Sequence, residues 1–222
     1  MRALAPGLIL HPGFLDAAAR GALAEDVAGV LAHAPPVTPT MPRSGRPFSV
    51  RMSNAGPLGW VSDRAGYRYQ GHHPETGRPW PPIPARLLDA WAELTGWPLP
   101  PEACLINLYG PSARMGLHQD RDEEDLTAPV LSLSLGAGAL FRYGGLARGD
   151  PTRSVRLAPG DALVIGGASR LIHHGIDRIL PSPEPDLWEG DGFGALRAVL
   201  PAGGRCNLTL RRVSRAPGPA GA

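Results

Sequence analysis

The chain of 222 residues contains no lysine, so all 22 of its basic residues are arginines, set against 20 acidic residues. The formal net charge of +2 is too small to indicate nucleic-acid binding by itself. Ala, Gly and Pro are abundant as well, and a GC-rich coding bias explains these features together with the missing lysine. Selection for phosphate contacts would also favour arginine, and composition alone does not separate the two explanations.

Cysteines and long apolar runs are also scarce. Two cysteines, Cys104 and Cys206, are too few for a disulfide framework, and both lie in strand-like apolar patterns that predict buried, reduced thiols. No apolar run reaches about 18 residues, which excludes a spanning helix. Pro6, His11 and Pro12 interrupt the apolar N-terminal patch, so we do not expect a signal peptide. The expectation is a cytoplasmic monomer without membrane contact.

The length suits one sizeable domain and is too short for two. We expect that domain over residues 1–213, followed by a disordered tail over 214–222 that is mostly Ala, Gly, Pro and Arg. Helical spacing of apolar residues predicts one helix over Leu15–His33. A second helix is predicted to begin at Pro84 and end at Gly96.

Strands dominate the remainder of the chain. An early strand is predicted over Phe48–Met52, and after the second helix the pattern predicts strands only, separated by Gly, Pro and Asp. The later predicted strands are Ala103–Tyr109, Arg114–His118, Pro129–Leu135, Ala139–Tyr143, Arg153–Leu157, Asp161–Ile165, Leu171–His174 and Arg205–Val213. The segment Pro181–Gly204, rich in Pro, Gly and acids, is predicted to be an excursion between the last two strands. This order favours a mostly β, α+β fold: an antiparallel double sheet of jelly-roll type with helices on one sheet.

The stretch 107–122 contains the sequence His118-Gln119-Asp120, which sets an imidazole and a carboxylate two residues apart. In an extended segment, side chains at i and i+2 lie on the same face, so both can reach one point. A second imidazole, His174, follows another apolar run. His-x-Asp alone is common as a turn or a cap, but two His and one carboxylate leave about three of six coordination positions open. Such a set suits non-haem Fe(II).

The far end of the chain carries a polar ladder. Alternation along residues 205–211 places Cys206, Leu208 and Leu210 on one face and Arg205, Asn207, Thr209 and Arg211 on the other. A guanidinium group can bind a carboxylate through two parallel hydrogen bonds. We therefore expect two inward-facing cations on this strand.

Aromatic residues concentrate in one region between the two helices. Trp60, Tyr67 and Tyr69 lie among Gly and Asp in short segments that predict hairpins. On the pattern alone, packing filler is favoured over stacking platforms for a flat ligand. His72 and His73 precede a proline in a turn, where a solvated surface pair is expected rather than a metal site.

The whole set of residues, from about Phe48 to Arg212, resembles the AlkB family of iron- and 2-oxoglutarate-dependent dioxygenases. The resemblance implies a double-stranded β-helix (jelly roll) with N-terminal helices and a nucleotide-recognition lid over about residues 35–82. It implies His118, Asp120 and His174 as the Fe(II) ligands, since the family carries the last ligand immediately before Gly. His173, its neighbour, would point to the opposite face of a strand.

The resemblance also implies a binding site for 2-oxoglutarate. Its distal carboxylate would lie at Arg205, helped by Tyr109 and Asn207. Arg211 and Asn107 would lie nearer the C1 end, with Arg211 counted among the catalytic residues. Alternation from Arg205 favours Arg211 as an inward residue over a surface arginine.

The implied activity is oxidative demethylation of N-alkylated bases, 1-methyladenine and 3-methylcytosine, for DNA repair in single-stranded DNA or in RNA. Decarboxylation of 2-oxoglutarate, with dioxygen, would be coupled to methyl hydroxylation and release of formaldehyde. By the resemblance Trp60 stacks on the base opposite His118, Tyr67 contacts a phosphate, and Asp122 accepts from an exocyclic amine. The remaining implied substrate-binding residues are Tyr69, Arg148, Met52, Met115 and Ser132. Asp122 and the acids over 123–125 are also compatible with a solvated loop.

Two other functions stay open at this point. One is an Fe(II)/2-oxoglutarate hydroxylase that acts on protein or a small molecule; the aromatic residues and Asp122 argue instead for a base. The other is a non-enzymatic or zinc-bound β-helix module, against which the paired Arg205 and Arg211 argue. His173 and Ile165 depart from the residues common in the family, and both would change pocket packing.

Overall fold

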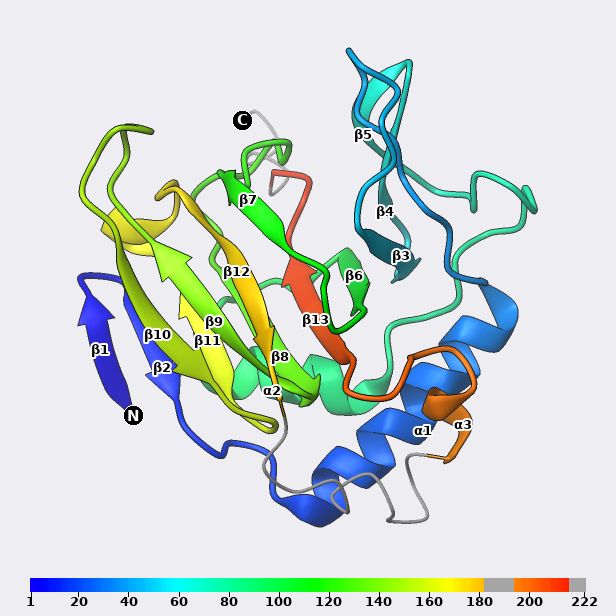
Figure 1. The fold of residues 1–222 in the computed structure, drawn as a ribbon, viewed down its shortest axis with the longest axis horizontal. Helices are drawn as coiled ribbons and strands as arrows, with labels where there is room; N and C mark the ends of the chain where they lie inside the picture. Colours follow the sequence, from blue (N-terminus) through cyan, green and yellow to red (C-terminus); the bar gives the residue numbers. More distant parts are fainter. Residues whose placement is uncertain (182–193, 216–222) are drawn as a thin grey trace, which may run out of the picture.

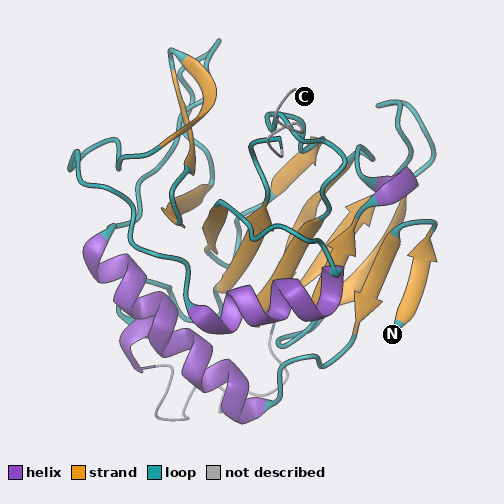
Figure 2. Ribbon diagram, turned by 180° about the vertical axis from the view of Figure 1, so that it is seen from behind, coloured by secondary structure: helices purple, strands orange, loops and turns teal. Residues whose placement is uncertain are grey.

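A computed structural model describes residues 1–181 and 194–215. Two antiparallel sheets face each other, and two helices pack on the outer face of the larger one (Figures 1 and 2). The mostly β, jelly-roll architecture expected from the strand order is confirmed. Within the described residues, no helix combines the length and apolarity needed to cross a bilayer.

The larger sheet has seven strands and the smaller sheet has four. Across the larger sheet the order is β1 (Arg2–Ala5), β2 (Leu8–His11), β11 (Ala162–Ile165), β8 (Val130–Gly136), β13 (Arg205–Arg211), β6 (Ala103–Tyr109) and β3 (Val50–Ala55). The smaller sheet runs β10 (Arg153–Leu157), β9 (Gly138–Tyr143), β12 (His174–Leu180) and β7 (Met115–His118). Of the predicted strands, β6 and β10 have the bounds expected from the sequence.

Both predicted helices form close to their expected limits. Helix α1 (Ala17–His33) begins after Asp16, whose carboxylate accepts from the Ala19 amide at 2.8 Å and so caps the first turn. Helix α2 (Ala85–Thr95) ends at Gly96, which has a φ of 59° in the left-handed region that terminates helices.

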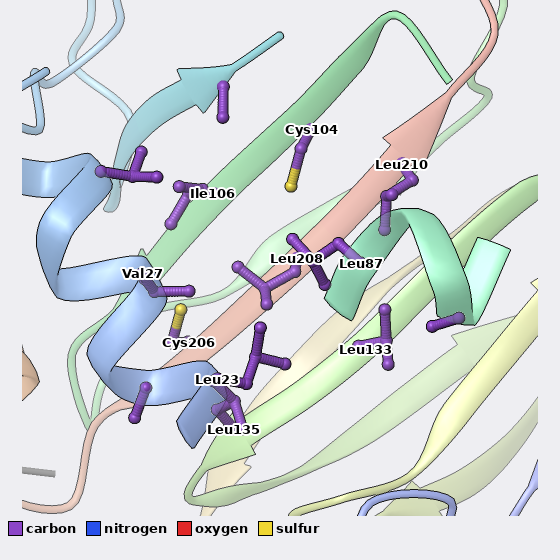
Figure 3. Packing of buried hydrophobic residues seen from close by; sticks show 14 of the residues in the cluster. Leu23, Val27, Leu87, Cys104, Ile106, Leu133, Leu135, Cys206, Leu208 and Leu210 are labelled. Carbon is purple, nitrogen blue, oxygen red and sulfur yellow. The ribbon is translucent and has the colours of Figure 1, made fainter. Parts of the chain in front are cut away.

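Alternation along the central strands divides the interior into two layers. Cys206, Leu208 and Leu210 of β13 face the helices and are fully buried (Figure 3). The intervening side chains of the same strand face the smaller sheet, where a second apolar cluster includes Phe141 and Ile176. The polar ladder of β13 therefore lies between the two sheets, as its pattern predicted.

A hairpin of β4 (Gly59–Asp63) and β5 (Gly66–Gln70) projects beside the two sheets (Figure 1). The hairpin prediction for the aromatic segment is confirmed. Within the expected lid of residues 35–82, however, β3 pairs with β6 and belongs to the larger sheet. The expectation of a solvated histidine pair is wrong for His73, which is buried with its Nε2 2.8 Å from the Pro35 carbonyl.

Several boundaries differ from the predicted ones. Strand β12 begins at His174, where the predicted strand Leu171–His174 was to end, because a 3-10 turn (η1, Gly167–Ser169) occupies the preceding segment. Strands β1 and β2, at one end of the larger sheet, had not been expected. A short helix, α3 (Gly194–Arg197), lies within the predicted excursion Pro181–Gly204, where no helix was expected, and its Leu196 is buried in the core that α1 contacts.

Two sequence predictions fall partly outside the described residues. These are the excursion, of which 182–193 is not described, and the tail, of which 216–222 is not described. At the start of the tail, the Ser214 amide donates to a carboxylate oxygen of Glu102 at 2.6 Å.

Candidate active site

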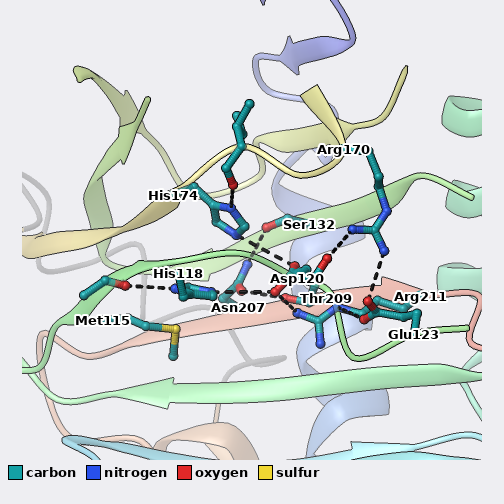
Figure 4. A network of polar contacts seen from close by, with 12 residues as sticks. Met115, His118, Asp120, Glu123, Ser132, Arg170, His174, Asn207, Thr209 and Arg211 are labelled. Carbon is teal, nitrogen blue, oxygen red and sulfur yellow. Dashed lines mark hydrogen bonds and ion pairs between the residues drawn. The ribbon is translucent and has the colours of Figure 1, made fainter. Parts of the chain in front are cut away.

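Two neighbouring strands bring the three predicted metal ligands together. His118 ends β7, His174 begins β12, and the register pairs these two residues directly. Asp120 follows β7 by two residues. One ligand atom from each of the three side chains lies within 4.8 Å of the others (Figure 4). The structure thus brings together the two imidazoles and the carboxylate, a set that suits non-haem Fe(II).

Backbone carbonyls orient both imidazoles. Nδ1 of His118 lies 2.9 Å from the Gly116 carbonyl, and Nδ1 of His174 lies 3.2 Å from the Ile172 carbonyl. A proton on each Nδ1 leaves each Nε2 with its lone pair. Each Nε2 lies 3.7 Å from a carboxylate oxygen of Asp120. Such outer hydrogen bonds fix the tautomer that binds a metal.

Burial and neighbouring charges hold the ligands in the forms that bind a cation. Burial lowers the pKa of His174 to about 4, so this imidazole is neutral at neutral pH. Burial by itself would raise the pKa of Asp120, but Arg211 and the two imidazoles outweigh it and hold that pKa below its usual value. A neutral imidazole and an ionised carboxylate are both metal-binding forms.

Arg211 joins the metal ligands to a buried network of charges. Its Nη2 lies 2.8 Å from Asp120 Oδ1, and its Nε lies 3.3 Å from Glu123 Oε1. The Tyr69 hydroxyl donates to the same Glu123 oxygen at 2.6 Å. Arg170 pairs with the other Glu123 oxygen at 3.1 Å and donates to the Asp120 carbonyl at 2.6 Å (Figure 4). The network fixes both the side chain and the backbone of Asp120.

This network corrects one of the alternatives left open by the sequence. Glu123 and Asp125 are both buried rather than solvated. Glu123 and Arg170 escaped the sequence prediction because their pairing joins two loops 47 residues apart, and no periodic pattern marks either residue. Thr209 had been placed on the inward face of β13, and its hydroxyl donates to the Asn207 side-chain oxygen at 3.0 Å.

Arg205 is a buried cation without a carboxylate. Its side chain is fully buried, and its guanidinium donates to Ser134 Oγ at 2.9 Å and to the Ala137 carbonyl at 3.4 Å. Within the described part of the chain it makes no ion pair, and its Nε has no hydrogen-bond partner. An uncompensated buried charge is costly, so a carboxylate ligand fits this position. The Asn107 side-chain oxygen nearby in the same cavity is also buried without a partner.

A cavity of about 790 Å³ unites the predicted site. Among the predicted residues, the cavity is lined by Met52, Trp60, Tyr67, Asn107, Tyr109, Met115, His118, Asp120, Asp122, Ser132, Arg148, His174, Arg205, Asn207 and Arg211. Tyr69 is the exception: its half-buried side chain does not line the cavity, and its hydroxyl is held by Glu123 and Arg211. The structure places Tyr69 in support of the site.

Aromatic side chains from the β4–β5 hairpin form one wall of the cavity. Trp60 and Tyr67 are stacked, with ring centroids 5.5 Å apart and planes inclined by 18°. The Trp60 indole N–H donates to Asp122 Oδ2 at 2.8 Å. The side chain of Asp122 therefore faces this wall and leaves its other oxygen for a further donor.

Known proteins resemble this chain over nearly its whole length. Residues 7–211 match the family model described as the 2OG-Fe(II) oxygenase superfamily. An "Alpha-ketoglutarate-dependent dioxygenase AlkB homolog" of Caulobacter vibrioides is 50% identical over 211 residues, which cover 95% of this chain and 90% of that one. The "Alpha-ketoglutarate-dependent dioxygenase AlkB" of Escherichia coli is 44% identical over 78% of this chain and 81% of its own. The chain belongs to the AlkB family.

A solved structure supports this membership. The structure titled "The structure of OsALKBH1" matches with a TM-score of 0.77 and 32% identity, covering 95% of this chain and 99% of the other. Together with the His118, Asp120 and His174 cluster, membership identifies this AlkB-family chain as a dioxygenase that uses Fe(II), 2-oxoglutarate and dioxygen. The unpaired Arg205 and the donor set of the cluster fit those groups.

Proposed function

We propose that this enzyme removes methyl groups from N-alkylated bases, 1-methyladenine and 3-methylcytosine, in single-stranded nucleic acid. DNA is the proposed preferred strand and RNA a second substrate, with the enzyme acting as a monomer in DNA repair. The observation that carries the proposal is the wall of Trp60, Tyr67 and Asp122 in the same cavity as the metal ligands. This wall offers a flat aromatic surface and a carboxylate acceptor, the two features needed to hold an extruded base.

Within the cavity, each wall residue has a proposed contact. Trp60 stacks on one side of the base and His118 lies on the other. Asp122 accepts from the exocyclic amine of adenine or cytosine with the oxygen that Trp60 leaves available. Tyr67, whose side chain is partly exposed, contacts the phosphate backbone, and Arg148 lies in the loop between β9 and β10 beside the substrate. Met52, Met115 and Ser132 complete the pocket wall.

The polar ladder has a proposed role in binding 2-oxoglutarate. Arg205 takes the distal carboxylate, because its buried guanidinium has no acid partner among the residues that the structure describes, with Tyr109 and Asn207 beside it. Arg211 and Asn107 lie toward the C1 end. Arg211 is already paired with Asp120, which makes it a poorer partner for the distal carboxylate than Arg205.

Bound iron, with 2-oxoglutarate and dioxygen, would supply the oxidation that hydroxylates the methyl group, with succinate and carbon dioxide as the co-products. The resulting N-hydroxymethyl group breaks down to formaldehyde and the free base. The chain's own residues hold the base against the metal ligands and exclude water around them. Hydroxylation in this way needs no general base from the protein.

The names of relatives favour a nucleic-acid substrate over the alternative of a protein or small molecule. A human relative named "Nucleic acid dioxygenase ALKBH1" is 39% identical over 46% of this chain, although that match spans 25% of the human protein. The exposed aromatic wall also argues for the base, since a hydroxylase for small molecules has no evident need of it.

The test is repair of a single-stranded oligonucleotide that carries one 1-methyladenine. Protein with Fe(II), ascorbate and oxygen is assayed with and without 2-oxoglutarate, and the mass of the base is followed. We expect loss of one methylene that requires 2-oxoglutarate and disappears in His118→Ala. A 3-methylcytosine substrate and an N6-methyladenine substrate serve as parallel arms.

The outcomes separate the enzyme class from the substrate class. Conversion of 2-oxoglutarate to succinate without loss of mass from any methylated base would keep the dioxygenase and reject the nucleic-acid substrate. An iron-loaded, folded protein with no turnover of 2-oxoglutarate at all would contradict the assignment as a dioxygenase.

A further inference from the structure

The outer face of the four-stranded sheet is strongly basic. In Figure 1 this sheet lies in front, and Figure 2 shows the helices on the opposite side of the molecule. Its inward side chains, such as Phe141 and Val155, are buried against the larger sheet. The charged residues of its four strands, apart from the histidines, are Arg142, Arg153, Arg156, Arg178 and Asp177. Arg153 lies two residues before the buried Val155 on the same strand, shares its inward side and is therefore not on the outer face. The outer face thus carries three arginines, Arg142, Arg156 and Arg178, against one aspartate, whereas the whole chain has 22 basic and 20 acidic residues.

The strand register gathers these arginines into one patch. Arg156 of β10 and Arg178 of β12 both pair with Leu140 of β9, one on each side of it. With strands about 4.8 Å apart, their Cα atoms lie roughly 10 Å from each other. Arg142 follows two residues after Leu140 on the same face of β9.

Among the described residues, neighbouring acids compensate little of this charge. Arg142 Nη1 lies 3.9 Å from Asp177, with both side chains about two-fifths exposed, which is a weak surface contact. The side chains of Arg156 and Arg178 are exposed and make no hydrogen bond or ion pair with any described residue. Long guanidinium groups held on a rigid sheet, with their charge open to solvent, suit a polyanion.

One end of the patch meets the opening of the cavity. Strand β12 begins with the metal ligand His174 and reaches Arg178 four residues later, about 13 Å along the strand. Strand β9 continues from Arg142 into the loop that carries Arg148, which lines the cavity. A nucleic-acid strand that leaves the cavity past Arg148 can therefore continue over Arg142 to the other two arginines.

We propose that this face, Arg142, Arg156 and Arg178, binds the phosphates of the single strand on one side of the base held in the cavity. The proposal rests on the proposed function, since it takes the strand that enters the cavity as its ligand. The contacts are to phosphates, so they carry no sequence preference. They extend the binding site beyond the nucleotides next to the lesion.

The test compares two double variants that lose the same charge. The sheet variant combines Arg156→Ser and Arg178→Ser, and the control combines Arg86→Ser and Arg197→Ser. Arg86 and Arg197 are exposed on α2 and α3, in the helical layer behind the larger sheet. Binding of an unmodified single-stranded oligonucleotide of about 25 nucleotides is measured over a range of salt concentrations. Loss of two phosphate contacts should weaken binding about tenfold at low salt and reduce the slope of log K against log salt by about 1.4. The control should change neither.

Repair of methylated substrates gives the second readout. The sheet variant should keep wild-type kcat/KM on a methylated trinucleotide and lose several-fold on long substrates. Two further series of substrates are extended only 5′ or only 3′ of the lesion. In one series the sheet variant should respond to substrate length as the wild type does, and in the other it should fall short, because the patch lies to one side of the opening.

Equal losses in the two double variants, or an unchanged affinity for the long oligonucleotide, would overturn the proposal and leave an acidic protein surface as the alternative ligand of the patch. Failure of the proposed function would look different. In that case, wild-type protein would not demethylate the trinucleotide at all, whichever arginines were present.

Discussion

At the scale of single residues, the two buried arginines of β13 have different partners and therefore different expected roles. Arg211 is neutralised by Asp120 and Glu123, while Arg205 has no acid among the described residues. Removing Arg211 should disturb the iron ligand itself. Removing Arg205 should disturb only what the unpaired cation is there to bind.

Arg205→Lys should raise the KM for 2-oxoglutarate by roughly 30- to 100-fold and leave iron affinity nearly unchanged. A lysine keeps the charge but loses the two-pronged contact, a loss of about 2–3 kcal/mol. Initial rates of succinate formation against 2-oxoglutarate concentration give the KM, and titration with Fe(II) under nitrogen gives the affinity. Arg212→Lys, at the residue that follows β13 and whose side chain is held by Glu102, is the matched control and should show neither change. A KM within twofold of wild type would contradict the role proposed for Arg205.

The two thiols should be inert in the folded protein. Cys104 and Cys206 are fully buried against the helices, and burial raises the pKa of Cys206 to about 12 and also raises that of Cys104. Little thiolate forms at pH 8, and thiolate is the reactive form. A chromogenic disulfide reagent should therefore label neither cysteine in native protein and both in denaturant. Rapid labelling of the native enzyme would show that the helical layer opens.

At the scale of elements, the β4–β5 hairpin is attached to the metal site through one hydroxyl. Tyr69 bridges Glu123 and Arg211, and Arg211 in turn holds Asp120. The hairpin therefore carries two different tyrosines: Tyr69 is half-buried and hydrogen-bonded to residues beside the metal ligands, while Tyr67 is exposed on the cavity wall.

Removing these two hydroxyls should have separable effects. Tyr69→Phe leaves Glu123 short of a buried donor, which should lower the free energy of unfolding by about 1–3 kcal/mol and raise the rate at which protease cleaves the hairpin. Tyr67→Phe should change stability by less than about 0.5 kcal/mol but weaken binding of oligonucleotide. Urea unfolding and limited proteolysis measure the first effect, and a binding titration the second. Equal stability of both variants would show that the hairpin does not depend on Tyr69.

The sequence predicted those strands and helices that have one apolar face and one polar face. Alternation in β13 placed Arg205 and Arg211 inward and Cys206 outward, and the structure agrees. It did not predict that Glu123 is buried or that Arg170 is its partner, because their ion pair joins two irregular segments far apart in sequence. The sequence also did not show that Tyr69 lies off the cavity wall, because the two faces of a hairpin have similar residues until their long-range partners are known.

At the scale of the whole molecule, the metal site ties stability to pH. An unfolded chain protonates a histidine near pH 6.5, while the fold lowers the pKa of His174 to about 4. Between these values the unfolded state binds more protons, so the free energy of unfolding falls as the pH drops from about 6.5 to about 4. For His174 the loss amounts to about 3 kcal/mol at most.

Urea midpoints of metal-free protein at about pH 7 and about pH 4.5 measure this loss. His174→Gln should flatten the dependence, since its side chain takes no proton. A variant as sensitive to pH as the wild-type protein would show that other groups are responsible.

The double role of β13 has a consequence for how this enzyme can evolve. One face of the strand packs against the helices and the other lines the cavity, so inserting or deleting a single residue within it would exchange the two faces. Arginines would then be forced into the helical core and leucines into the cavity. Descendants of this chain can change the strand by replacing one residue with another, but they cannot change its length without exchanging its two faces.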